Sequence, residues 1–211
     1  MTFTSLASSS RGNAYVVSDG ETTLLLECGL SFKELQKRLG YGVAGITACL
    51  VSHEHQDHAK AAAQLLKSGV PVYMSEGTAA AHKDAMDAAH LIKAGDVLRF
   101  GHLTVVPFRT FHNTDEPLGF LIEDRRTGER LLWAVDTANL GVTADKLTYI
   151  AVECNYEERL LNRSDRIPSV LKERIRHSHF EVNDVIKWLH KQDLSGVLTI
   201  FGTLLFMLSE N

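Results

Sequence analysis

The feature that most constrains this chain is a run of metal-binding residue types, with His53, His55, Asp57 and His58 inside six positions. The run stands between an apolar segment that predicts a strand and an Ala-rich segment, 59–67, that predicts a helix. In extended backbone, His53 and His55 project from the same face because they lie two residues apart. Asp57 and His58 fall at the turn into the helix and can reach a second position nearby. The spacing predicts a metal site above the end of a sheet, rather than a solvated loop that happens to be rich in histidine.

The residue types also indicate which metals the site suits and where further ligands belong. Imidazole and carboxylate groups bind zinc, and they also suit manganese or iron without any thiolate. His112 follows the apolar run 103–108, and Asp136 follows the apolar run 131–135, so both belong at strand ends. Alone, such a histidine is usually a loop residue and such an aspartate a cap, but the upstream run favours ligands. Asp136 has two carboxylate oxygens and can bridge two metal ions about 3.5–4 Å apart.

Length and charge limit the classes of protein to consider. A chain of 211 residues with 45% hydrophobic content suits one globular domain with a substantial core. The net charge of −4 gives no overall attraction to nucleic acid or to anionic membranes. A nucleic-acid partner would therefore need a local basic patch.

Cysteine usage and hydropathy indicate the compartment. Cys28, Cys49 and Cys154 are widely spaced and odd in number, which predicts buried thiols in a reducing environment rather than a disulfide framework. The N-terminus lacks the pattern of a signal peptide, and no apolar segment reaches the roughly 18 residues of a membrane span. We expect a cytoplasmic protein without a membrane segment.

The order of apolar runs and turn residues predicts a mixed α/β chain. Strand, helix and strand alternate in the first half, which implies a parallel sheet with crossover helices, and hairpins follow from residue 96. The expected strands are 2–7, 14–18, 22–28, 46–52, 72–74, 97–100, 103–108, 118–123, 130–135 and 149–154. The expected helices are 31–39, 57–68, 77–87, 157–162, 169–176 and 182–191, before a last apolar run, 197–208.

Several of these stretches resemble one known family. The His-rich run, then His112, then Asp136 within Ala134-Val135-Asp136-Thr137, are similar in order and spacing to the metallo-β-lactamase superfamily. Residues 5–13, 27–30, 76–78 and 112–120 narrow the resemblance to its WalJ (YycJ)-like branch, which is related to ribonuclease Z and ribonuclease J. The resemblance spans nearly the whole chain. It implies an α/β (α+β) fold, a four-layer αββα sandwich, formed by a single domain over residues 1–211.

The same resemblance implies a centre with two divalent metal ions, zinc or manganese. By position, it assigns the first ion to His53, His55 and His112, the second to Asp57 and His58, and the bridging role to Asp136. It also implies catalytic roles for Asp57, which would orient or deprotonate the attacking water, and for His179. Asn155 and His179 match motifs near the substrate, although His179 could equally be a surface histidine at a helix N-terminus.

Two departures from the family pattern stand out. Glu27 occupies a position where relatives usually carry aspartate beneath the metals. At the C-terminus, Met207 stands where the family has its last histidine ligand, and the end of the chain reads as shortened or divergent. Methionine is a poor ligand for hard divalent ions, so we expect a weaker second metal site and uncertain activity.

The implied activity is metal-dependent hydrolysis of phosphodiesters by an activated water, in the manner of a 5′→3′ DNA exonuclease. A small-molecule hydrolase of the same fold, acting on a thioester, lactone or cyclic phosphodiester, is the main alternative. A catalytically weakened relative that binds metal or nucleic acid is another. Basic residues could form a phosphate track or simply a solvated helix face: Arg159, Arg163, Arg166, Lys172, Arg174 and Arg176. The sequence does not indicate the oligomeric state.

Overall fold

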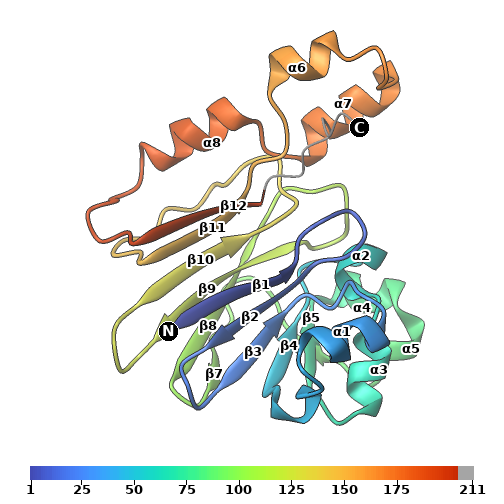
Figure 1. The fold of residues 1–211 in the computed structure, drawn as a ribbon, viewed down its shortest axis with the longest axis vertical. Coiled ribbons are helices and arrows are strands. Elements are labelled where there is room, and N and C mark those ends of the chain that lie inside the picture. Colours follow the sequence, from blue (N-terminus) through green and yellow to red (C-terminus); the bar gives the residue numbers. More distant parts are fainter. Residues whose placement is uncertain (204–211) are drawn as a thin grey trace. The chain divides into compact units, whose positions relative to one another are not determined.

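The computed structural model describes residues 1–203, which divide into two units (Figure 1). Unit 1 comprises residues 1–109 and 114–128, and unit 2 comprises residues 110–113 and the chain from residue 129 onward. Met207 lies outside the described residues, so its effect on a metal site stays a prediction. The single domain expected over residues 1–211 also stays a prediction.

Alternating apolar residues in the first part of the chain form the sheet that carries the His-rich run. Its six strands take the order β1-β2-β3-β4-β5-β6, with antiparallel pairing as far as β3 and parallel pairing beyond it. The strands are β1 (Thr2–Ala7), β2 (Ala14–Ser18), β3 (Thr23–Leu26), β4 (Ala48–Leu50), β5 (Val72–Met74) and β6 (His90–Leu91). The five strands expected between residues 2 and 74 are therefore present, with the expected parallel pairing among the later ones, and β6 is a short addition that the sequence did not indicate.

The helices of unit 1 connect these parallel strands. Ser31 caps the first of them, because its hydroxyl accepts a hydrogen bond from the Glu34 N–H at 3.3 Å. The helices are α1 (Phe32–Arg38), α2 (Gln56–Ala59), α3 (Ala62–Lys67), α4 (Glu76–Ala81) and α5 (Lys83–Met86), with one 3₁₀ turn at Val43–Gly45.

The single helix expected over residues 57–68 was wrong, since the structure has α2 and α3 instead. The Ala61 N–H donates at 2.9 Å to the carbonyl of Cys28, outside the helix, so the helical ladder is interrupted there. The helix expected over residues 77–87 is likewise divided, because His82 adopts φ −115° and ψ 71°, outside the helical region. In both cases a local tertiary contact or backbone angle overrides helix propensity.

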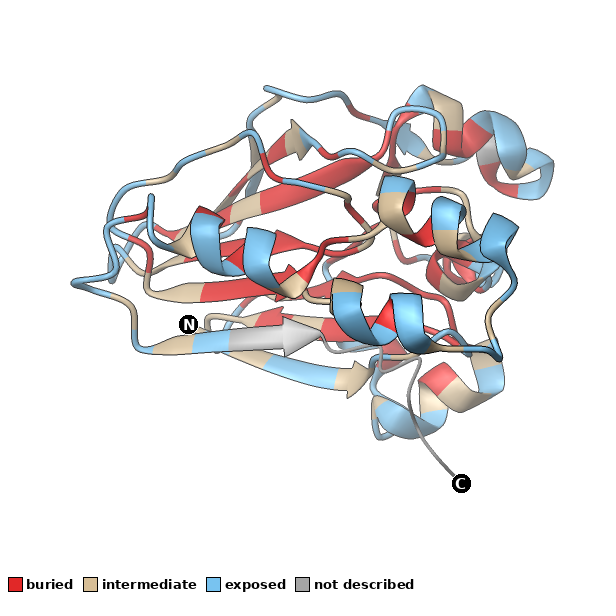
Figure 2. Cartoon of the chain, turned by 90° about the horizontal axis from the view of Figure 1, so that it is seen from above, coloured by how far each residue is buried: buried red, intermediate tan, exposed pale blue. Residues whose placement is uncertain are grey.

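One continuous apolar cluster fills the space between this sheet and its helices. Leu25, Cys49 and Val72 from the strands pack with Leu35 of α1 and Leu65 of α3, and all five are fully buried. Cys28 belongs to the same cluster, and burial raises the pKa of the adjacent Cys49 thiol well above its usual value. In Figure 2 the helices carry buried residues on one side and exposed residues on the other, as amphipathic helices do.

The remaining strands follow two pairing patterns. In unit 1, β7 (Leu98–Phe100), β8 (Leu103–Arg109) and β9 (Leu118–Asp124) pair antiparallel, and the β7–β8 pair is a predicted hairpin. In unit 2, β10 (Arg130–Ala134), β11 (Tyr149–Glu153) and β12 (Thr199–Thr203) pair parallel. Strands β10 and β11 are almost wholly buried, which agrees with parallel strands that are covered on both faces.

The helices of unit 2 lie between β11 and β12 in the chain. They are α6 (Glu158–Arg163), α7 (Ser169–Ser178) and α8 (Val182–Leu189). Trp188 of α8 is buried and donates its indole N–H to the Val142 carbonyl at 3.0 Å, which anchors α8 to the loop after β10. Within residues 1–203, none of the helices has the length and apolarity that crossing a bilayer requires.

The His-rich run is fixed in place by close backbone packing at Gly29. A Cβ atom at Gly29 would lie 1.6 Å from the Asp57 carbonyl oxygen, which no side chain could tolerate. The same carbonyl accepts the Asn13 N–H at 2.8 Å, and the Cys28 N–H donates to the His58 carbonyl at 2.7 Å. The chain before α1 therefore acts as a backbone support for Asp57 and His58.

Gly29→Ala should destabilise the protein by about 3 kcal/mol or more, because the new methyl group overlaps backbone that cannot move alone. Chemical denaturation would measure the loss. Gly45→Ala is the matched control, since nothing lies within 4 Å of its Cβ position, and its stability should change by less than about 1 kcal/mol. Equal stability of the two variants would contradict the packing described for Gly29.

Candidate metal centre

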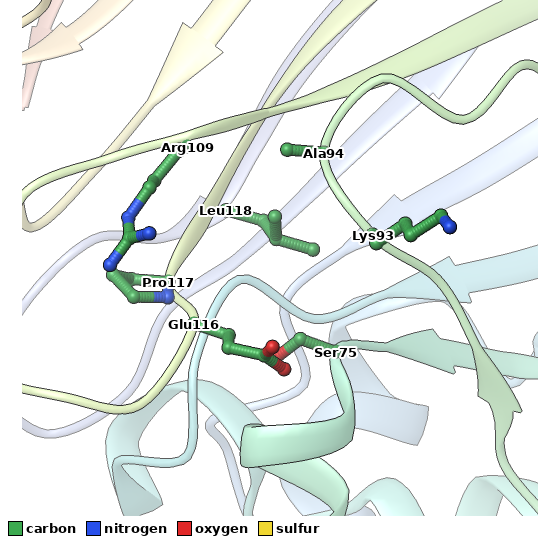
Figure 3. A pocket seen from close by; sticks show the side chains of 7 residues that line it. All are labelled: Ser75, Lys93, Ala94, Arg109, Glu116, Pro117 and Leu118. Atoms are coloured by element: carbon green, nitrogen blue, oxygen red, sulfur yellow. The ribbon is translucent and has the colours of Figure 1, made fainter.

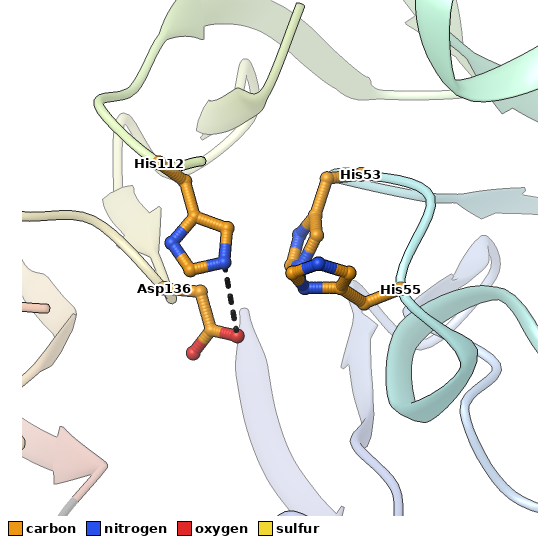
Figure 4. A group of neighbouring side chains, drawn as sticks. All are labelled: His53, His55, His112 and Asp136. Atoms are coloured by element: carbon orange, nitrogen blue, oxygen red, sulfur yellow. Dashed lines mark hydrogen bonds and ion pairs between the residues drawn. The ribbon is translucent and has the colours of Figure 1, made fainter. Parts of the chain in front are cut away.

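Two histidines of the run face each other where the chain leaves β4. His53 Nε2 lies 3.0 Å from His55 Nδ1, and the two rings meet edge to face (Figure 4). The other nitrogen of His53 contacts the Ser52 hydroxyl at 2.8 Å, which fixes the orientation of a ring that is 1% exposed. Two imidazole nitrogens this close either share a proton or direct their lone pairs at one cation. The pair therefore fits a metal with nitrogen ligands.

His58 lies under the same run, fully buried against carboxylate and amide groups. Its Nδ1 atom is 3.5 Å from the Glu27 carboxylate, and its Nε2 atom is 3.6 Å from the Asp57 carboxylate. The side-chain amide of Asn13 is 3.2 Å from that Nε2 atom, and it also donates to the Asp57 carbonyl. The ring of His58 lies 4.1 Å from that of His53. The structure thus brings together the four residues predicted within the run.

Glu27 shapes this side of the site from the end of β3. It adopts a positive φ of 64°, which is uncommon for a residue with a side chain and directs its carboxylate inward. One carboxylate oxygen accepts the Ser52 N–H at 3.2 Å, and the other faces His58. Because burial raises the pKa of Glu27, the contacts with His58 and Ser52 are needed to hold its charge. The longer side chain at this position is accommodated by these contacts.

In unit 2, the predicted residues His112 and Asp136 form a pair. His112 Nε2 lies 4.0 Å from the Asp136 carboxylate (Figure 4). The Nδ1–H group of His112 donates to the Ser178 carbonyl at 2.8 Å, an interaction that leaves the Nε2 lone pair directed into the site. Such backbone anchoring of the second nitrogen is typical of histidines that bind metals. Asp136 has a positive φ of 48°, so its backbone, like that of Glu27, is strained at the end of a strand.

Glu153 is the carboxylate on which this side of the site depends. It ends β11, is 2% exposed and accepts hydrogen bonds from the Thr137 N–H, the Asn155 amide and His179 Nδ1, at 2.8, 3.0 and 2.5 Å. We did not predict it as a site residue from the sequence. One signal was available, because Glu153 ends an apolar strand in the same way as Asp136.

The surroundings of His179 favour a protonated imidazole. Burial opposes its charge, but the hydrogen bond and the negative charge of Glu153 outweigh burial, so the pKa of His179 is raised. Its ring meets that of His112 edge to face, with centroids 5.4 Å apart. Ligand atoms of Asp136, Glu153 and His179 lie within 4.8 Å of one another, and His179 follows the C-terminal end of α7 rather than standing at a helix N-terminus.

The predicted residues thus gather within each unit, and their chemistry fits a divalent metal. In unit 1, the imidazole and carboxylate groups belong to the single run 53–58. In unit 2, they belong to residues that follow the ends of strands or of a helix, which are His112, Asp136 and His179. These donors are nitrogen and oxygen atoms, which zinc and manganese accept. The side-chain amide of Asn155 donates a hydrogen bond to Glu153. Its predicted contact with substrate stays a prediction.

Two of the basic residues predicted to track phosphates have partners within unit 2. Arg176 bonds to the carboxylates of Glu158 and Glu173 and to the Asn162 side chain. Lys172 donates to the Asn162 carbonyl at 3.1 Å. These bonds connect α6 with α7, so for Arg176 and Lys172 the alternative of a structural, solvated helix face is favoured.

Comparison with known sequences identifies similar proteins. The family model described as "Beta-lactamase superfamily domain" matches residues 22–199. The chain is 30% identical over 189 residues to a protein of Bacillus anthracis named exodeoxyribonuclease YycJ, and the match covers 82% of this chain and 69% of that protein.

Solved structures show the same fold. The metallo-β-lactamase fold protein YhfI from Bacillus subtilis superimposes with a TM-score of 0.69 at 16% identity, covering 97% of this chain and 86% of that one. The short form of human tRNase Z superimposes with a TM-score of 0.67 at 15% identity, covering 97% and 96%. The fold is therefore the mixed α/β metallo-β-lactamase fold with its two mixed sheets, as the resemblance implied.

Glu153→Ala should lower the free energy of unfolding by about 3 kcal/mol or more, because it leaves three hydrogen-bond donors without their acceptor in a buried place. Thermal or chemical unfolding would measure the loss. Glu173→Ala is the control, since its carboxylate is exposed on α7 and its ion pair with Arg176 should contribute less than about 1 kcal/mol. If both variants were equally stable, Glu153 could not be the support described here.

Proposed function

This chain belongs to the metallo-β-lactamase superfamily of hydrolases, and from that premise we propose that it is a metal-dependent phosphodiesterase that degrades DNA as an exonuclease. The observation that carries the proposal is the orientation of its histidines. His53 and His112 each have one nitrogen fixed by a neighbouring group, Ser52 and the Ser178 carbonyl, which leaves Nε2 to bind a metal. This arrangement prepares ligands before any ion arrives.

We assign the first ion to the four side chains drawn in Figure 4, which are His53, His55, His112 and Asp136. Three imidazoles and one carboxylate complete the set that zinc or manganese requires. Removing any one of these ligands should therefore weaken binding of the ion.

The second ion is assigned to Asp57, His58 and the bridging carboxylate of Asp136. His58 supports a weaker site here, because its Nε2 atom already contacts the Asn13 amide at 3.2 Å. A metal ion at that atom would have to displace the Asn13 donor. Weaker binding at the second site therefore follows from the surroundings of His58, independently of the residue at position 207.

The chain's own groups suit acid–base catalysis at a phosphodiester. When bound, the ions would supply a nucleophilic water at neutral pH and would offset the charge that builds on the phosphoryl oxygens. Asp57, whose carboxylate is 31% exposed, can accept a hydrogen bond from that water and orient it. Glu153 raises the pKa of His179, which favours the protonated ring, and Nε2 can donate its proton to the departing oxygen. Glu153 fixes the ring through Nδ1.

Two further assignments accompany the activity. A DNA substrate is supported by the similarity to YycJ of Bacillus anthracis, which is named an exodeoxyribonuclease. A cytoplasmic location is supported by the free thiols of Cys28 and Cys49, which are buried and reduced.

The activity is tested with end-labelled linear DNA and purified protein that has been stripped of metal. Adding manganese or zinc should restore degradation, and the double variant His53→Ala, His55→Ala should lose at least about a hundredfold of the rate because it no longer holds an ion. The labelled end also reports polarity, since a 5′→3′ enzyme releases a 5′ label first.

The control is the double variant His102→Ala, His177→Ala, which removes two solvent-accessible histidines that are not among the predicted metal ligands. It should keep the wild-type rate. Metal-independent cleavage, or equal cleavage by both double variants, would exclude the proposed centre as the source of activity. Absence of cleavage under every metal condition would exclude the nuclease.

A further inference from the structure

A pocket in unit 1 lies outside the groups assigned to metal binding and proton transfer. It has a volume of about 190 Å³ and is lined by Ser75, Lys93, Ala94, Arg109, Glu116, Pro117 and Leu118 (Figure 3). These residues come from the cap of α4, the loop after β6, the end of β8 and the start of β9. The volume is smaller than that of typical small-molecule sites, so it suits one part of a longer ligand.

The pocket combines two cations with an apolar floor. Figure 3 shows Arg109 and Lys93 on opposite sides, with Ala94 and Leu118 between them and Arg109 directed over Pro117. Within residues 1–203, the side chains of Arg109 and Lys93 make no hydrogen bond or ion pair. Unlike Arg176, they are not neutralised by a carboxylate, so their charge is available to an anion.

The polar groups beside the cations are already occupied. The Ser75 hydroxyl caps α4 by accepting from the Thr78 N–H and donating to the Thr78 hydroxyl. The Glu116 carboxylate accepts the Gly77 N–H at 2.9 Å, so it is fixed as part of the wall. Its negative charge reduces the attraction for an anion without cancelling two cations. Binding should therefore depend on Arg109 and Lys93 and should be opposed by Glu116.

The pocket wall is directly connected to the His-rich run. The Leu118 N–H donates to the Ser52 carbonyl at 2.9 Å, one residue before His53. The Asp115 N–H donates to the Glu54 carboxylate at 3.2 Å, between the two paired histidines. A ligand seated on Pro117 and Leu118 would therefore lie beside the loop that holds the first ion. All of these hydrogen bonds lie within unit 1.

We propose that this pocket binds one nucleotide of a nucleic-acid strand, next to the nucleotide being hydrolysed. Arg109 and Lys93 contact the phosphates on its two sides, and Ala94, Pro117 and Leu118 contact its sugar or base. Alternating charge and apolar surface is what a single strand requires, since phosphates and bases alternate along it. This inference rests on the proposed function and adds how the strand is held outside the metal centre.

Binding is measured by fluorescence anisotropy of a short labelled oligothymidylate, with metal-stripped full-length protein at several salt concentrations. The double variant Lys93→Ala, Arg109→Ala should bind roughly tenfold more weakly. Its plot of log affinity against log salt concentration should be shallower by about 0.7 for each phosphate that the variant no longer neutralises. Glu116→Gln should bind more tightly, because the amide oxygen still accepts from Gly77 while the negative charge is removed.

The matched control is Lys37→Ala, Arg99→Ala, which removes the same charge from exposed positions of unit 1 outside the pocket. It should retain wild-type affinity except for a small general charge effect. Thermal unfolding should show equal stability for all three variants, since every substituted side chain is exposed. If the pocket variant bound like this control, or if wild-type protein failed to bind the oligonucleotide, the pocket would not be a nucleotide site.

Hydrolysis of bis(p-nitrophenyl) phosphate with added manganese separates this outcome from failure of the metal centre. The small ester does not need the pocket, so the pocket variant should hydrolyse it at the wild-type rate while binding the oligonucleotide weakly. If the pocket variant hydrolysed the ester and also bound the oligonucleotide as tightly as wild-type protein, the pocket would not be a nucleotide site, while the proposed hydrolase activity would stand. Lack of turnover by wild-type protein would overturn the proposed function, and the anisotropy result would still decide the pocket.

Discussion

Backbone packing around Asp57 is the constraint on which the His-rich run of unit 1 depends. Asn13 donates to the Asp57 carbonyl, Gly29 lies against the same carbonyl, and Cys28 donates to the carbonyl of His58. The run itself is too short to hold its side chains in place, because α2 is a single turn of helix. Its geometry is therefore imposed by residues that precede it in the chain by about thirty to forty-five positions.

The two units use the same device to position a histidine. In each, a buried glutamate at the end of a strand accepts a hydrogen bond from a backbone N–H beyond the end of a neighbouring strand, and it also faces an imidazole. Glu27 holds the Ser52 N–H and His58, and Glu153 holds the Thr137 N–H and His179. A buried carboxylate needs polar partners of this kind to offset its loss of water. In return, it fixes the orientation of the imidazole ring that faces it. The environment differs in one respect, since Glu153 also accepts from Asn155.

The sequence places the candidate ligands at strand ends and in one short run because their signal is local. Spacing by two residues places His53 and His55 on one face, and the apolar runs before His112 and Asp136 mark strand ends. The supporting residues have no such signal. Glu153 was missed because its role depends on His179, 26 positions away, and the break between α2 and α3 depends on a hydrogen bond from Ala61 to Cys28. The pocket at Arg109 requires four chain segments to meet, which periodicity does not reveal.

The central claim is that the predicted histidines bind a metal ion, and zinc affinity tests it most directly. Zinc is titrated against a chromophoric chelator into wild-type protein, His53→Ala and His112→Ala, with His177→Ala as the control. Either ligand substitution alone should weaken the tightest site by on the order of a hundredfold, because the same ion is left with three of its four ligands. If either ligand substitution left the affinity of the tightest site at the wild-type value, the proposed set of ligands would be contradicted.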